Sequence, residues 1–111
     1  SGAGLMDRSL PPEELALIET ALAPYRKDGI AFRALMTRRS GRRSFVSLAV
    51  LAPSDWTIAR GHELLERIER DIVAALPQAA VATHLEPSAA VSKKKRLIVR
   101  NRTRRGSPRK R

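Results

Sequence analysis

The chain has 111 residues, which is enough for one small domain with a modest hydrophobic core. It contains no cysteine, so disulfides, thiolate metal ligands and cysteine nucleophiles are excluded. No run of about 18 apolar residues occurs in it, and we therefore expect no membrane-spanning helix within this sequence.

The net charge of +11 is concentrated at the C-terminal end. Residues 93–111 hold 11 of the 22 Lys and Arg residues and no acidic residue, whereas residues 1–92 carry equal numbers of basic and acidic residues. We therefore expect a lead-in at residues 1–8, a folded domain of no net charge at residues 9–87, and a basic, disordered tail at residues 88–111.

The tail is suited to anionic partners. Its basic residues can bind anionic lipid or nucleic acid through the release of counterions. It has no aromatic side chain on which a base could stack, so nucleic acid is the less expected of the two partners.

The first helix is predicted over residues 9–25. Ser9 is a suitable N-cap, two prolines fall in or just before the first turn, and Glu13 and Glu14 favour the positive end of the helix dipole. Three apolar residues follow the i, i+3, i+7 spacing of a buried stripe: Leu15, Ile18 and Leu22.

Two short apolar runs, residues 30–37 and 44–52, are predicted to pair as a β-hairpin around the Ser40-Gly41 turn. In the second run, a period of two residues separates an apolar face from a less apolar one. The first face consists of Val46, Leu48 and Val50, and the second of Phe45, Ser47 and Ala49. This asymmetry is typical of an antiparallel pair with one covered side.

A basic patch flanks the hairpin turn, and it consists of Arg38, Arg39, Arg42 and Arg43. One interpretation is a solvated edge that resists aggregation. The other is a docking surface for phosphate, lipid headgroups or an acidic partner. The sequence favours neither.

The clearest helix is predicted over residues 57–75, with Thr57 as its cap and Pro77 after its end. Its expected buried stripe consists of Ile58, Leu65, Ile68, Ile72 and Leu76. The third strand is predicted over residues 79–86. The order α-β-β-α-β indicates an α+β fold, in which two helices cover one face of a three-stranded sheet. The other face, with Phe45, is left for a partner.

Few residues are suited to catalysis or metal binding. The sequence has no Gly-rich phosphate loop and no Ser/His/Asp set, so we do not expect an enzyme. In the stretch VATHLEP, a two-residue period puts His84 and Glu86 on one face of a strand. Imidazole and carboxylate both suit zinc, so the pair is either half of a metal site or the polar rim of a sheet. His62, on the second helix, is either a half-buried structural histidine or a further ligand.

Four segments together resemble the C-terminal cytoplasmic domain of the cation diffusion facilitator family, which are proton-coupled metal efflux transporters. They are GLMDRSLP at 4–11, TRRSGRRSFV at 37–46, DWTIARGHELLERIE at 55–69 and ATHLEP at 82–87. The resemblance implies a ferredoxin-like, metallochaperone-like sandwich on the cytoplasmic face of a membrane. It also implies a homodimer, formed partly through the sheet, beneath a transmembrane domain, with metal binding that brings the subunits together.

The resemblance also implies metal-ligand positions, two of which are altered here. Typical members have a histidine at the start of the first strand, where this chain has Arg33, and another in the second strand, where it has Ala49. His62, His84 and Glu86 remain. A cation 4 Å from Arg33 would be repelled by about 4 kcal/mol per unit charge at an effective dielectric constant of about 20. We therefore expect a weakened, relocated or absent zinc site, with Arg33 pairing to Glu86 of its own chain or of a partner.

The sequence thus predicts a dimerising, regulatory domain of a zinc-type efflux transporter that transports nothing by itself. The alternative is a small basic protein that binds anionic lipid or nucleic acid through its tail. Deleting residues 93–111 separates the two, because it abolishes binding in the second case and leaves dimerisation intact in the first. A third function, a monomeric metal carrier, is disfavoured by the missing hairpin ligands.

Overall fold

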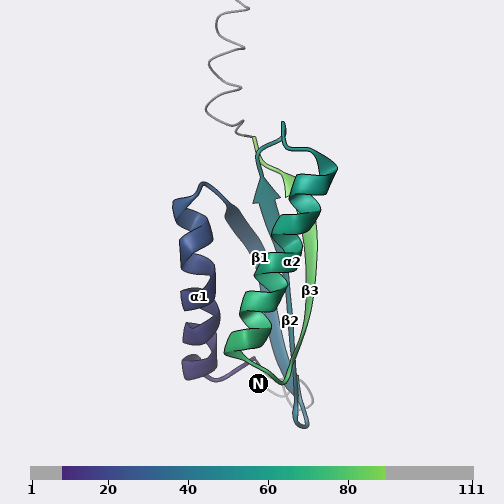
Figure 1. Ribbon diagram of the computed structural model, residues 1–111. Coiled ribbons are helices and arrows are strands. Elements are labelled where there is room, and N and C mark those ends of the chain that lie inside the picture. Colours follow the sequence, from purple (N-terminus) through teal and green to yellow (C-terminus); the bar gives the residue numbers. More distant parts are fainter. Residues whose placement is uncertain (1–8, 90–111) are drawn as a thin grey trace, which may run out of the picture.

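The computed structural model describes residues 9–89, and the predicted lead-in and nearly all of the predicted tail lie outside that part. Five elements follow one another in the order α-β-β-α-β (Figure 1). They are α1 (Pro12–Lys27), β1 (Ala31–Ser40), β2 (Arg43–Ala52), α2 (Ile58–Ala75) and β3 (Ala79–Pro87). The predicted order is confirmed, and both hairpin strands extend closer to the turn than predicted.

The three strands form one sheet in the order β1-β2-β3. β1 and β2 are antiparallel, whereas β2 and β3 are parallel and joined by α2. Both helices lie on one side of the sheet, so the predicted two-layer α+β sandwich is confirmed (Figure 1). We call the side under the helices the covered face and the other side the open face.

The core lies between the helices and the covered face. Val46, Leu48 and Val50 of β2 are buried there, as the two-residue period predicts. They pack with side chains of both helices, of which the most buried are Ile18, Leu22, Leu64, Ile68 and Ile72. Full burial of each such side chain contributes about 1.5–3 kcal/mol, so this layer is the main source of stability.

The buried stripe of α2 agrees with the prediction at Ile68, Ile72 and Leu76 and differs nearer the start of the helix. Leu64 is buried where Leu65 was expected, and Ile58, at the start of the helix, is 86% exposed. The physical reason is a close approach of α2 to β3 at Gly61, where an added Cβ would lie 2.3 Å from Cδ2 of Leu85. The residues of α2 that are buried are therefore Gly61, Leu64, Ile68 and Ile72.

The two helices begin differently. The predicted cap of α2 is confirmed, because Oγ1 of Thr57 accepts a hydrogen bond from the backbone N–H of Arg60 at 3.0 Å. The predicted cap of α1 is wrong: the helix follows Pro11 rather than Ser9, and no side chain caps it. A proline at the first helical position, where the N–H has no helical partner anyway, makes this start possible.

A hydrogen bond joins the two helices. The hydroxyl of Tyr25 in α1 donates to a carboxylate oxygen of Asp71 in α2. Burial of the phenol, and then the hydrogen bond and negative charge of Asp71, raise the pKa of Tyr25 to about 12.

A β-bulge interrupts β1. Arg33 lies opposite Ala49 and Met36 lies opposite Ser47, so two residues of β1 face one residue of β2. Ala34 in the bulge has a φ of 58°, which is uncommon for a residue other than glycine. A strict two-residue period would place Arg33 and Met36 on opposite faces of the sheet. The bulge brings both side chains to the open face.

Candidate functional site

The open face carries the predicted site residues in rows that run across the three strands. The pairing of the strands gives these rows directly. From the hairpin turn onward they are Arg38–Phe45–Ala80, Met36–Ser47–Ala82 and Arg33–Ala49–His84, followed by Leu51 beside Glu86. The prediction that His84 and Glu86 share a face is therefore confirmed.

An ion pair crosses the open face from one edge strand to the other. Nε and Nη2 of Arg33 donate to Oε1 of Glu86 at 3.1 and 2.8 Å. Because Arg33 lies on β1 and Glu86 on β3, the two side chains meet over β2. Ala49 is only 4% exposed although no helix covers it, which is consistent with this pair lying above it. The small side chain at residue 49 leaves room for the arginine.

The two histidines lie on different sides of the sheet. His84 is exposed on the open face, in the row of Arg33 and Ala49. His62 projects from α2, which packs on the covered face; its side chain is 69% exposed, and its Nε2 lies 3.2 Å from Oε2 of Glu66. One chain therefore does not bring His62 to His84 and Glu86. Within residues 9–89, no three side chains of His, Cys, Asp or Glu are grouped as metal ligands.

The arginines of the basic patch have different surroundings. Arg39 points to the covered face and forms an ion pair with Glu14 of α1. The guanidinium carbons of Arg38 and Arg43 lie 4.3 and 5.9 Å from the ring centre of Phe45, within the range of cation–π contacts. Arg42 is exposed in the turn.

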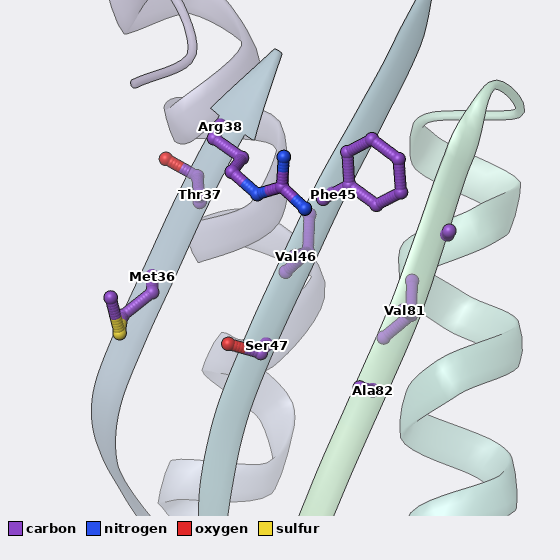
Figure 2. Close-up of a pocket in the computed structure, with 9 residues that line it drawn as sticks. Met36, Thr37, Arg38, Phe45, Val46, Ser47, Val81 and Ala82 are labelled. Carbon is purple, nitrogen blue, oxygen red and sulfur yellow. The ribbon is translucent and has the colours of Figure 1, made fainter. Parts of the chain in front are cut away.

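A shallow hollow of about 340 Å³ lies on the open face near the hairpin (Figure 2). Arg38 and Phe45 form one side of it, and Met36, Ser47 and Ala82 line its floor and opposite side. Met36 is 67% exposed, so the hollow presents an apolar side chain to solvent. The sequence did not predict a role for Met36, because the bulge that turns it to this face has no glycine to signal it.

Comparisons with known proteins agree on one family. The family described as "Cation efflux protein, cytoplasmic domain" matches residues 10–88. A transporter of Synechocystis, uncharacterized by its name, is 46% identical over 85 residues, which are 77% of this chain and 27% of that protein. The cation-efflux pump FieF of Pectobacterium atrosepticum is 31% identical over 93 residues, or 83% of this chain and 30% of the pump. The chain thus spans less than a third of either relative.

Solved structures share the fold. The zinc form of CzrB, described as a putative zinc transporter, is 30% identical with a TM-score of 0.66, and the match covers 79% of this chain and all of that one. The fold is therefore complete in that chain within the matched region. The metal-bound C-terminal domain of CzcD from Thermotoga maritima shares the fold at 20% identity and a TM-score of 0.61, over 75% of this chain and all of that one.

These findings bear on the whole described part of the chain. In residues 9–89, neither helix is long and apolar enough to cross a membrane. The family match runs from the first buried residue of the fold to the residue after β3. The resemblance found in the sequence is confirmed, and the chain belongs to the family of cytoplasmic domains of cation efflux proteins.

Proposed function

We propose that the chain acts as a regulatory and dimerising domain of a zinc-type divalent-cation efflux transporter, and that it transports nothing by itself. The family match over residues 10–88 supports the first part. The relatives of greater length are a transporter and a cation-efflux pump, so the membrane domain and the transport step would belong to the rest of such a protein.

The surface for dimerisation is the open face. It is apolar near the hairpin, where Phe45 is half-buried and Met36 is largely exposed beside the small side chains of Ala80 and Ala82. A second copy could fill the hollow with an apolar side chain and remove Met36 from water. Burial of apolar surface contributes about 25 cal/mol per Å², which makes such contacts the main driving force of association.

The metal site of this domain is altered. A closed zinc site needs about four ligands around the ion, and the open face offers His84 beside a carboxylate that Arg33 already occupies. Arg33 and Ala49, in the row of His84, supply no ligand, and the guanidinium would repel a cation. The residues present do not fit a complete metal site, and we propose that the Arg33–Glu86 pair replaces the metal as the link between the edge strands.

The Arg33–Glu86 pair is the observation that carries this proposal, and a zinc titration tests it. Residues 1–92 would be titrated with zinc by calorimetry, while sedimentation measures the fraction of dimer with and without the metal. We expect a dimer without zinc and no heat at micromolar zinc. Heat of binding at micromolar zinc that disappears in His84→Ala but persists in His62→Ala would contradict the proposal that the metal site is altered. A monomer at all concentrations would overturn the dimerising function.

A further inference from the structure

The first and the last residues of the described fold lie at opposite ends of the sheet. Leu10 is fixed beside the hairpin, because its backbone N–H donates to Oγ1 of Thr37 at 3.3 Å. After β3, the backbone N–H of Ser88 donates to the carbonyl oxygen of Ala52 at 2.8 Å, at the far end of β2. β2 spans residues Arg43–Ala52, which corresponds to roughly 30 Å at about 3.3 Å per residue.

The hairpin lies at the same end as the start of the fold and extends past the ends of both helices (Figure 1). Its turn carries the exposed side chains of Arg42 and Arg43. In the described part of the chain, neither of these two has an acidic partner, whereas Arg39 is neutralised by Glu14. Contact with the ring of Phe45 orients Arg43 beside Arg38. The hairpin end is therefore a cationic tip, in which the ring of Phe45 positions the guanidinium groups of Arg38 and Arg43 and the side chain of Arg42 is exposed.

We propose that this tip, formed by Arg38, Arg42 and Arg43, binds the phosphate groups of anionic lipids. The inference rests on the proposed function, and on the resemblance to a C-terminal cytoplasmic domain, which implies that a membrane domain precedes Leu10 in the chain. The end that holds Leu10 then faces the bilayer, and the hairpin beside it extends toward the lipid headgroups. Guanidinium groups bind phosphate oxygens through paired hydrogen bonds, and the attraction acts within about 10 Å of the surface.

The same geometry separates the tip from the end of β3. Ser88, the residue after β3, lies at the end of the sheet away from the hairpin. The arginines that the described fold carries toward the membrane are thus those of the hairpin. From the sequence, lipid binding was expected of the tail and was one of two interpretations of the basic patch at the hairpin, and the two locations can be tested against each other.

The experiment uses vesicles made of equal parts phosphatidylcholine and phosphatidylserine, with pure phosphatidylcholine vesicles as the reference. Co-sedimentation would compare residues 1–92 with the same protein carrying Arg42→Ser and Arg43→Ser. We expect the double variant to bind the anionic vesicles about 30-fold more weakly, given about 1 kcal/mol for each basic residue near a charged surface. Binding of the parent should also fall as salt is added.

The matched control is Lys27→Ser with Arg60→Ser, which removes the same charge from exposed positions at the opposite end of the domain. We expect this pair to bind as the parent does. An equal loss in both variants would overturn the proposal, because net charge alone would then explain binding. Unchanged binding in the hairpin variant would overturn it as well.

Two further outcomes also decide against the tip. If the full chain binds anionic vesicles and residues 1–92 do not, the tail is the lipid ligand. If residues 1–92 bind a DNA duplex as tightly as the vesicles, the tip is a general anion surface.

Sedimentation of the hairpin variant reports separately on dimerisation. A dimer that no longer binds vesicles supports the tip and leaves the proposed function intact, whereas a parent that binds vesicles as a monomer removes the dimerising function alone.

Discussion

The two faces of the sheet are built from the same strands but are stabilised in different ways. On the covered face, Val46, Leu48 and Val50 are buried by helices that lie next to them in the fold. On the open face, Ala49 is buried with no helix above it, beside an ion pair between residues 53 positions apart in the chain. The burial of the covered face therefore follows from a local pattern of apolar residues. The burial of Ala49 on the open face follows from a contact between residues far apart in the chain.

This difference indicates where the fold can be changed without being lost. The covered face holds the core, and each of its side chains contributes to stability. The open face contributes little to folding, because its charged side chains remain partly in water. Its residues are thus free to serve an interface or a ligand, and four changes would break or sharpen the comparison.

The largest expected effect is a gain of zinc binding on the open face. Arg33→His with Ala49→His would put two imidazoles in the row of His84, which makes three across β1, β2 and β3. The change would also release the carboxylate of Glu86 from its ion pair. Adjacent strands are about 4.8 Å apart, which lets neighbouring imidazoles share an ion. We expect zinc to bind with a Kd of about 1 µM or better, or about 8 kcal/mol. Calorimetry would measure it, with His84→Ala added as the control that abolishes it.

A loss of core packing on the covered face should come next. Ile68 is fully buried in α2, and Ile68→Ala is expected to lower the free energy of unfolding by about 2–5 kcal/mol, through lost burial and the cavity left behind. Urea denaturation would measure the change. Met36→Ala, a truncation of an exposed side chain on the open face, should change the free energy of unfolding of the monomer by less than about 0.5 kcal/mol, when measured at a protein concentration too low for dimerisation. Equal effects of the two substitutions would contradict the distinction between the faces.

The helix layer should also make the stability depend on pH in the alkaline range. The pKa of Tyr25 is raised to about 12 in the folded protein, against about 10 in an unfolded chain. The folded state therefore holds this proton more tightly, and its contribution to stability is complete below about pH 10 and lost as the pH rises through about 12. Denaturation at a series of alkaline pH values should show this decline, and Tyr25→Phe should make the decline shallower.

The smallest expected effect is that of the ion pair itself. The side chains of Arg33 and Glu86 are 60% and 35% exposed, so a double-mutant cycle with Arg33→Ala and Glu86→Ala should give a coupling of about 0.5 kcal/mol. The pair Arg26–Glu19 on α1, with both side chains about half exposed, is a matched control on the helix layer. A coupling above about 2 kcal/mol for Arg33–Glu86 would mean that the open face stabilises folding as the core does.

The sequence alone predicted most of the fold. The alternation in β2 and β3 identified both faces of those strands, because a two-residue period survives wherever a strand is regular. It did not reveal the bulge in β1, since Ala34 adopts a positive φ that glycine usually signals. In α2, the prediction failed only near the start of the helix, where Ile58 is exposed and Leu64 rather than Leu65 is fully buried. Gly61 reads as a gap in an apolar pattern, although α2 approaches β3 closely there.

The residues of the candidate site could be identified from the sequence, but their positions relative to one another could not. His84 and Glu86 were correctly placed on one face, since they belong to one strand. The position of His62 relative to them depends on which side of the sheet α2 covers, and no spacing within the chain encodes that. The partnership of Arg33 with Glu86 was anticipated from a resemblance and from charge, whereas the burial of Ala49 beneath it required the strand register.

Because Gly61 and Leu85 are in contact, the residue at one of these positions limits the size of the side chain that fits at the other. A methyl group at residue 61 would meet the end of the Leu85 side chain, which would have to turn further into solvent or become shorter. Gly61→Ala alone should therefore gain helix propensity and lose packing, while Gly61→Ala with Leu85→Val should keep the gain. Related chains that carry a larger residue at the first position are accordingly expected to carry a smaller one at the second.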